Sequence, residues 1–346
     1  MASSFPVVVL TAAYIYGRAL LLGCMVLPML VYRLLRAPKA KSWDAPPKCL
    51  RDEELGQHGY VTVKGLKFHY VEKGDRSKPL MLFVHGFPEF WYSWRHQMKE
   101  FSKDYWTVAI DMRGYGDSSK PAKVSDYKVE LLVDDIKGIV DELGKKTFIL
   151  VAHDWGAVIS WVFVDKYPEM VEKYVMMNGP HPKVYAYLMA NSKSQSRKSW
   201  YIFLFQLPFL PELFVKTDNF SMFDRIFINP KKRQAWVTDD DIEAFKYTFS
   251  QPGAISPPIN YYRAAMRRRV FEGFEERKTA KPKTGARPPG LYLFGVEDVA
   301  IDIANVEKHK DFFQPIETVL IPEGNHFVQQ DKPQAVNDAM RSFLKK

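Results

Sequence analysis

Three residues, Asp154, Asp298 and His326, have the types and the chain order that covalent hydrolysis requires. Asp154 stands in "ILVAHDWGAVIS", where an apolar run ends and small residues follow, as in the strand–turn–helix elbow that lifts a nucleophile above an α/β sheet. Asp298 in "GVED" and His326 in "EGNHF" follow later apolar runs, in the order nucleophile, acid, histidine. A carboxylate attacks carbonyl groups poorly, but at a strained or activated sp³ carbon it displaces a leaving group and becomes an alkyl ester.

This chemistry predicts epoxides or alkyl halides as substrates, with Asp154 as the nucleophile. His326 would then activate water against the ester, while Asp298 would orient His326 and stabilise its cation. We expect His153, the residue before the nucleophile, to support the elbow structurally.

The segment "FVHGFPEFWYSW" follows an apolar run and predicts an oxyanion hole. In this architecture such a loop supplies one backbone N–H, here from Phe87, and the residue after the nucleophile, Trp155, supplies a second. His85, Gly86 and Pro88 would support the loop. Gly86 and Pro88 are also compatible with an ordinary tight turn.

Alternating strands and helices must position these residues. Residues 60–74 predict a β-hairpin with a turn at Lys64-Gly65, and residues 131–144 predict a helix that ends at Gly144. Further strands are expected at 80–85, 106–111, 147–152, 173–178, 291–295 and 316–322. This alternation predicts an α/β fold with a mostly parallel central sheet and helices on both faces.

The expected organisation has four parts. The core would comprise residues 60–178 and 290–346, and residues 179–289, rich in aromatic residues and proline, would form an inserted all-helical cap. Residues 37–59 read as a proline-rich linker on which no core should depend, and residues 1–36 as a membrane anchor.

Residues 5–32 carry one charge, that of Arg18, and exceed the roughly 20 apolar residues that a bilayer core requires. A buried core helix and a cleaved signal peptide are the alternatives; the stretch is too long and lacks the basic start of a signal peptide. We expect a single-pass anchor in the endoplasmic reticulum or microsomal membrane. The catalytic domain would face the cytosol, because basic residues follow the span at positions 33, 36, 39 and 41.

The 346-residue chain has a formal net charge of +9 and two cysteines, Cys24 and Cys49. A structural disulfide, a metal site and a cofactor are not expected, since no Cys/His cluster has zinc spacing. Nucleic-acid binding is not expected either, because no binding module is recognisable. The basic triplet Arg267–Arg269 fits a solvated helix face or a membrane-surface contact. Nothing predicts the oligomeric state.

From about residue 60 the chain resembles the α/β-hydrolase-fold epoxide hydrolases, and it is most similar to their membrane-anchored epoxide hydrolase 3 and 4 type. The motifs "HGFPEFWYSWRHQ", "DMRGYGDSS", "HDWGA" and "NHFVQQDKP" carry the resemblance. It implies two cap tyrosines that donate to the epoxide oxygen: Tyr262 in "PINYYRAAM" and Tyr201 in "WYIFLFQLP". Tyr185, Tyr187 and Tyr247 compete for these roles. The aromatic cap and the anchor suggest lipophilic epoxides, fatty-acid epoxides among them, that are converted to vicinal diols.

Three other functions share parts of this pattern. A haloalkane dehalogenase shares the fold and the Asp nucleophile, but the tyrosine motif and Phe87 favour an oxygen leaving group. A catalytically silent, membrane-anchored binding protein is disfavoured because all three triad positions are filled. A serine esterase would need another elbow, and Ser118 and Ser119 lie in a loop without a following helix.

Overall fold

The computed structural model describes residues 5–36, 41–43, 45–227, 237–272, 287–313 and 316–346. Parts of the expected anchor (1–4), linker (37–40 and 44) and cap (228–236 and 273–286) lie outside these residues, as do 314–315 and the side chains of Arg268 and Arg269. Two compact units emerge from the contacts within the chain. The cap unit comprises Met1–Arg51, Lys120–Lys128 and Ser199–Lys281; the core unit comprises Asp52–Ser119, Val129–Lys198 and Pro282–Lys346.

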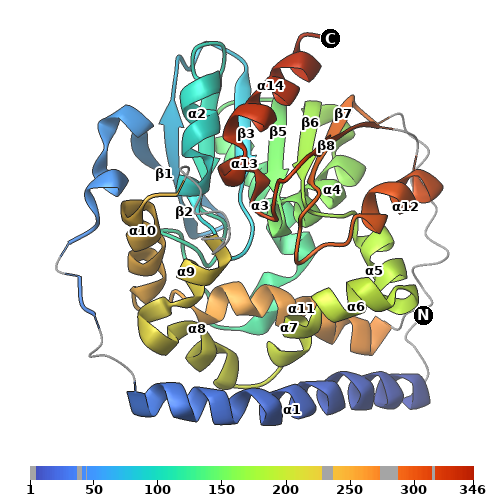
Figure 1. Ribbon diagram of the computed structural model, residues 1–346. Coiled ribbons are helices and arrows are strands. Elements are labelled where there is room, and N and C mark those ends of the chain that lie inside the picture. The colour runs from blue at the N-terminus through green and yellow to red at the C-terminus, as the bar shows by residue number, and fades with distance from the viewer. Residues whose placement is uncertain (1–4, 37–40, 44, 228–236, 273–286, 314–315) are drawn as a thin grey trace. The chain divides into compact units, whose positions relative to one another are not determined.

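The core unit contains an eight-stranded sheet in the order β1-β2-β4-β3-β5-β6-β7-β8 (Figure 1). The pairs β1–β2 and β2–β4 are antiparallel and every other neighbouring pair is parallel, so the predicted α/β fold is confirmed. The strands are β1 (Gln57–Val63), β2 (Leu66–Lys73), β3 (Leu80–Val84), β4 (Trp106–Ile110), β5 (Phe148–His153), β6 (Val171–Met177), β7 (Gly290–Gly295) and β8 (Glu317–Ile321).

The central strands β3, β4 and β5 are buried at every residue, as expected of parallel strands covered on both faces. Two groups of helices provide this cover, α3 packing beside α4 and α14 beside α2. The core helices are α2 (Arg95–Phe101), α3 (Val129–Glu142), α4 (Trp155–Lys166), α5 (Pro182–Asn191), α6 (Lys193–Lys198), α12 (Ala304–Phe312), α13 (Val328–Asp331) and α14 (Pro333–Leu344). Asp154, Asp298 and His326 follow the carboxyl ends of β5, β7 and β8, the edge at which α/β sheets place their sites.

The described part of the cap unit is helical. It contains α1 (Phe5–Arg36), α7 (Trp200–Leu204), α8 (Leu210–Phe220), α9 (Met222–Phe227), α10 (Asp239–Ser250) and α11 (Ser256–Glu272). A short segment from between β4 and α3 also belongs here, because Tyr127 in its 3₁₀ turn (Val124–Tyr127) packs against Tyr261 with ring centroids 5.5 Å apart. Helices α5 and α6, which the sequence placed in the cap, group with the core unit instead.

Helix α1 is long and apolar enough to cross a membrane. It does not stand apart from the cap helices, since it packs against α7, α8 and α11 (Figure 1). Thr11, Ile15, Ala19 and Leu30 are buried on one side of it. Their spacings of four, four and eleven residues, about one, one and three turns, place them on one helix face.

The end of the expected linker also packs against the cap. Trp43 donates from Nε1 to a Glu243 carboxylate oxygen at 3.0 Å, and its ring meets Tyr247 edge-on at 6.5 Å. Leu50 is buried in the short 3₁₀ turn Lys48–Arg51, which contacts α10. The described residues 41–51 therefore differ from the contact-free linker that their prolines suggested.

Candidate active site

Asp154 occupies a sharp turn between β5 and α4, with φ 48° and ψ −119°. A non-glycine residue in this region is strained, and such strain clusters at functional sites. Two glycines make the turn possible: a Cβ on Gly156 would collide with the backbone of Val84, and one on Gly179 would lie 2.6 Å from the carbonyl oxygen of Asp154. Close packing around Gly156 and Gly179 therefore holds the turn that carries the Asp154 carboxylate, and neither position has room for a larger side chain.

The three chemically suggestive residues meet in the core unit. His326 lies with Nδ1 2.8 Å from Asp298 Oδ2 and with Nε2 3.5 Å from Asp154 Oδ2. All three side chains are buried. The imidazole therefore bridges two carboxylates, the arrangement that a histidine needs to exchange protons on one side while it is oriented from the other.

Asp298 accepts hydrogen bonds at both carboxylate oxygens. Oδ1 accepts from the backbone N–H groups of Ala300 and Ile301, at 2.7 and 2.8 Å. Oδ2 accepts from Asn178 Nδ2 at 2.7 Å, in addition to its bond with His326. Asn178 in turn accepts from the N–H of Gly295 at the end of β7, which fixes the carboxylate relative to the sheet.

The negative carboxylates and the positive imidazolium of the site stabilise one another's charged forms. Burial alone would lower the pKa of His326, but the carboxylates of Asp298 and Asp154 outweigh burial and raise it from 6.5 to about 10. For Asp154, burial would raise the pKa, yet the net direction is downward because His326, His153 and the Phe87 N–H stabilise the anion. At neutral pH the resting site thus holds an ionised Asp154 beside a protonated His326.

The loop after β3 approaches the Asp154 carboxylate directly. The backbone N–H of Phe87 donates to Asp154 Oδ1 at 2.7 Å. Gly86 is required here, because a Cβ at this position would overlap the Asp154 side chain. Pro88 follows Phe87 through a cis peptide bond, and Trp155, the second expected donor, is the first residue of α4.

His85 anchors this loop through hydrogen bonds from its two ring nitrogens. Its Nδ1 lies 2.9 Å from the carbonyl oxygen of Gly86, and its Nε2 accepts from the N–H of Met112 at 3.1 Å. Complete burial lowers the pKa of His85, which favours the neutral ring that such a donor and acceptor pair requires. These contacts are structural and support the position of Phe87.

His153 and Glu89 form a buried pair beneath the site. The Nδ1 atom of His153 lies 2.6 Å from a Glu89 carboxylate oxygen, and its Nε2 lies 2.8 Å from the carbonyl oxygen of His326. Glu89 also accepts from the N–H of Gly86 at 3.1 Å. Burial raises the pKa of Glu89, but His153, the Gly86 N–H and His85 together outweigh burial, and the net direction is downward.

Glu89 therefore links the loop that carries Phe87 to the loop that carries His326. The second carboxylate oxygen of Glu89 accepts hydrogen bonds from the side chains of Gln329 and Gln330, at 2.7 and 2.9 Å. Sequence reasoning missed both Glu89 and Asn178. Glu89 stood inside the quoted "HGFPEFW" motif, and Asn178 directly followed a predicted strand. Their positions after predicted strands could have marked both as candidate site residues. Their hydrogen-bond partners lie far apart in the chain and could not be predicted from the sequence.

The two expected tyrosines belong to the cap unit and lie together there. Tyr201 on α7 and Tyr262 on α11 have ring centroids 5.8 Å apart. Phe205 packs edge-on against both, at 5.6 and 5.0 Å. Gln206 donates from Nε2 to the carbonyl oxygen of Tyr262 at 3.4 Å, so α7 and α11 are tied at this point.

The competing tyrosines have other surroundings. Tyr185 and Tyr187 lie on α5, in the core unit, where Tyr187 packs against Phe312. Tyr247 lies on α10 and packs against Trp43. Tyr201 and Tyr262, by contrast, contact each other ring to ring.

No group of three or more His, Cys, Asp or Glu residues with metal-binding proximity occurs in the described ranges. Residues 79–333 match the protein family described as alpha/beta hydrolase fold. The chain is 40% identical to mouse "Epoxide hydrolase 4" over 344 residues, covering 96% of this chain and 92% of the relative. It is 39% identical over 342 residues to "Epoxide hydrolase 3" of Xenopus tropicalis, covering 96% and 90%.

Solved structures resemble the chain as well. An epoxide hydrolase from Bacillus megaterium, solved in complex with an inhibitor, aligns with a TM-score of 0.73 and 34% sequence identity. The alignment covers 83% of this chain and all of the bacterial one. An epoxide hydrolase from Vigna radiata aligns with a TM-score of 0.71 and 30% identity, over 85% of this chain and 99% of the plant protein.

Proposed function

Because the chain belongs to the epoxide hydrolases of the α/β-hydrolase fold, we propose that it converts lipophilic epoxides into vicinal diols through a covalent ester on Asp154. One observation carries the mechanism. A buried carboxylate at a strained turn has a backbone N–H on one oxygen and a histidine, itself oriented by a second carboxylate, near the other. Neither a serine nor a metal is needed to explain this arrangement.

The first step is attack by a carboxylate oxygen of Asp154 on an epoxide carbon. A carbon–oxygen bond forms, a ring carbon–oxygen bond breaks, and the epoxide oxygen becomes an alkoxide. Tyr201 and Tyr262 donate to this oxygen and supply its proton; a phenol with a pKa of about 10 is a suitable acid toward so basic a group. The resting charge of His326 favours this step because it keeps Asp154 ionised.

The second step is hydrolysis of the enzyme's own ester. Esterification removes the negative charge of Asp154, one of the two carboxylates that raise the pKa of His326, so the imidazole gives up its proton more readily. Its proton restores the phenol, and the neutral ring then takes a proton from water as the water oxygen attacks the ester carbonyl. The N–H groups of Phe87 and Trp155 receive the oxyanion. When the tetrahedral intermediate collapses, the diol oxygen leaves and takes the proton of the newly formed carboxyl group. This step returns an ionised Asp154 beside a protonated His326.

The rival dehalogenase reaction would use the same nucleophile but release halide. Two adjacent tyrosines match a leaving oxygen that needs a proton, whereas a halide needs none. Parallel assays of diol formation and halide release on the purified protein separate the two activities. A protein with neither activity would support the silent binding protein instead.

Isotope labelling in a single turnover tests the ester. With enzyme in excess over epoxide in ¹⁸O-water, the first diol should be mostly unlabelled, because its new oxygen comes from Asp154. The label should appear in the peptide that contains Asp154. His326→Gln should slow the second step more than the first, so that an adduct of the epoxide mass accumulates.

A labelled first diol without any adduct would mean that Asp154 activates water directly, and it would overturn the nucleophile assignment. The matched control is Asp165→Asn, which removes a carboxylate from the end of α4 that lies opposite the elbow. This variant should retain the unlabelled first diol.

Attachment to a membrane through residues 5–32 is part of the proposal, supported by the length and apolarity of α1. The endoplasmic reticulum is the organelle that we propose, and the basic residues after the helix favour a cytosolic position of the core. Protease digestion of intact microsomes tests this orientation: the core should be degraded without detergent.

A further inference from the structure

Helix α1 is held against the cap along most of its length. Near its start, Tyr14 and the Arg18 guanidinium both pack on the ring of Phe203 in α7, with the guanidinium 4.3 Å from the ring centroid. In its middle, a Cβ on Gly23 would lie 2.6 Å from a methyl group of Leu207. Near its end, Arg33 lies 3.7 Å from a carboxylate oxygen of Asp218 in α8.

The opposite side of α1 is apolar from end to end. Within residues 6–32 the only charged side chain is Arg18, and it faces the cap. The large exposed apolar residues of this side are Val7, Val9, Leu10, Leu20, Leu21, Met25, Leu27, Val31 and Tyr32, followed by Leu34 and Leu35. Tyr14 and Tyr16 are also exposed but border the cap. A contiguous apolar surface of this extent marks an interaction site, and along a 32-residue helix it extends for about 48 Å.

We propose that α1 lies in the plane of the membrane interface, with its apolar side in one leaflet and the cap helices on its water side, in place of the single crossing that the sequence suggested. This inference rests on the membrane attachment proposed above and specifies its geometry. A crossing helix that kept its contacts would carry α7, α8 and α11 into the bilayer. The charged residues of those helices, among them Lys216, Arg263 and Arg267, make that costly.

Arg18 fits the in-plane arrangement. Its Nη1 donates to the Tyr14 hydroxyl at 2.8 Å, and its guanidinium lies over an aromatic ring of the cap. In a crossing helix this charge would sit near the middle of the span, where an arginine is most costly. In the plane of the interface it faces protein, and no lipid chain has to accommodate it.

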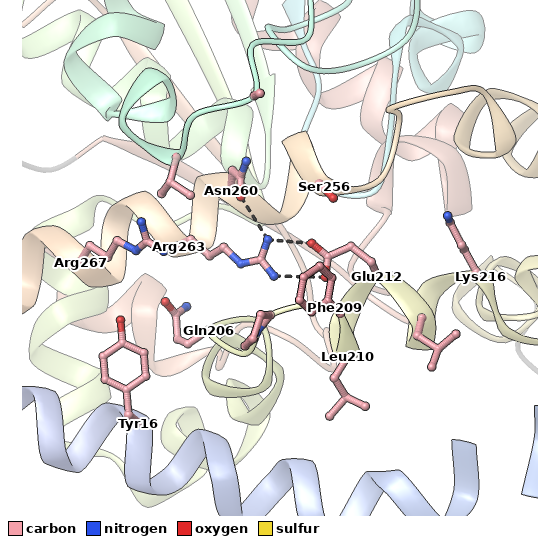
Figure 2. A pocket seen from close by; sticks show the side chains of 14 residues that line it. Tyr16, Gln206, Phe209, Leu210, Glu212, Lys216, Ser256, Asn260, Arg263 and Arg267 are labelled. Atoms are coloured by element: carbon pink, nitrogen blue, oxygen red, sulfur yellow. Dashed lines mark hydrogen bonds and ion pairs between the residues drawn. The ribbon is translucent and has the colours of Figure 1, made fainter. Parts of the chain in front are cut away.

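A groove beside α1 is lined by aromatic, apolar and basic side chains, as expected of a surface that contacts lipid head groups (Figure 2). It has a volume of about 1080 Å³ and is bordered by Tyr16 of α1. Exposed cations stand at its two ends, Lys216 and Arg267, and the anion Glu212 between them is paired with Arg263. Such cations attract the head groups of anionic lipids.

Phe209, at the rim of the same groove, is 85% exposed and has a φ of 61°. A bulky aromatic residue in this backbone region is strained, and here the strain holds an apolar ring in solvent. Contact with the acyl boundary of a leaflet would give that ring an apolar environment, as aromatic residues find at membrane interfaces.

Depth measurements along α1 test the proposal. Leu10, Leu21 and Leu35 are all exposed and are spaced by 11 and 14 residues, about three and four turns, so they lie on one side of the helix. Each would be replaced by cysteine in a Cys24→Ala, Cys49→Ala background and spin-labelled. The full chain would be reconstituted into phosphatidylcholine vesicles with anionic phosphatidylserine, and depth read from collisions with oxygen and a water-soluble nickel complex.

We expect all three labels at similar shallow depths, about 5–10 Å below the head groups. A label on Leu21 roughly 10–15 Å deeper than labels on Leu10 and Leu35 would show that α1 leaves the cap and crosses the bilayer, which overturns the inference but not the attachment. Exposure of all three labels to the nickel complex would overturn the attachment itself. A label at Lys103, exposed in the core unit, is the water-accessible control.

A pair of charge substitutions provides a second readout. Leu21→Arg places a cation on the lipid side of α1, and Leu131→Arg makes the same change at an exposed leucine of α3 in the core unit. We expect the first to lower partitioning into vesicles by about tenfold or more and the second to leave it unchanged. Equal partitioning of both variants would contradict a lipid-facing role for this side of α1.

Discussion

At the scale of single residues, the negative charge of Asp154 helps to keep His326 protonated. The imidazole lies between Asp154 and Asp298, and both carboxylates favour its protonated form. A histidine with a pKa of about 10 cannot act as a base at neutral pH until one of those charges is removed. Formation of the ester removes the charge of Asp154, so the first chemical step prepares the base for the second.

The raised pKa of His326 predicts a pH-dependent stability. Its folded-state pKa of about 10 exceeds the usual 6.5, so protonated His326 stabilises the fold fully below pH 6.5, and this contribution is lost as the pH rises through 10. The difference in free energy of unfolding between the wild type and His326→Gln should therefore shrink from pH 6.5 to pH 10. Urea unfolding at four pH values in this range measures it. A constant difference would contradict the assigned charge state.

The tyrosine pair predicts a defect confined to the first step. Tyr262→Phe removes one donor to the developing alkoxide while keeping the ring that packs on Tyr201 and Phe205. We expect alkylation to slow by about 10- to 1,000-fold, as for the loss of one oxyanion donor, with little change in ester hydrolysis. Rapid-quench kinetics separate the two rates. Tyr247→Phe, on α10, is the matched control and should change neither; equal slowing of both steps by Tyr262→Phe would indicate a packing role.

At the scale of secondary-structure elements, the loops that follow strands are fixed by groups buried beneath them. Glu89 joins the loop after β3 to His153 at the end of β5, and His153 contacts the loop of His326 after β8. Loops that follow three separate strands are thereby held by one buried hydrogen-bonded pair, Glu89 and His153. We expect a displacement of one of these loops to disturb the other two.

Helix α1 acts as part of the cap, and its removal should have a structural cost. A chain that begins at Asp52 lacks the helix that covers α7, α8 and α11, together with Trp43 and Leu50. We expect this truncation to destabilise the cap by several kcal/mol, because several apolar side chains lose their cover at roughly 1.5–3 kcal/mol each. Hydrogen exchange should rise in α7 and α11 but not in β3 or β5. Unchanged protection of the cap helices would show that α1 contributes no stability to them.

At the scale of the whole molecule, local patterns predicted much of the fold. The apolar runs at 80–85, 106–111 and 147–152 correspond to β3, β4 and β5, and the Lys64-Gly65 turn joins β1 to β2. What the sequence did not predict involves partners far apart in the chain. Neither the packing of α1 on helices that begin at Trp200 nor the inclusion of residues 120–128 in the cap unit has a local signature.

The same distinction applies to the site. The chemical types and order of the expected triad were readable, and the structure brings those three side chains together in the core unit. Glu89 and Asn178 were not readable, because a buried carboxylate or amide acquires its role only from the loops that it joins. The catalytic roles of the triad and of the tyrosines stay predictions until the kinetic experiments are done.

The packing of α1 on the cap also has a consequence for synthesis on the ribosome. α1 ends at Arg36, whereas its first partner helix, α7, begins at Trp200. At about 5–20 residues per second, roughly 10–30 s separate their translation. Throughout that interval the whole circumference of α1, including the side later covered by the cap, is without its protein partners. The emerging helix must then be received by a membrane or a chaperone before the rest of the cap exists, so its site of insertion is selected before the enzyme can fold.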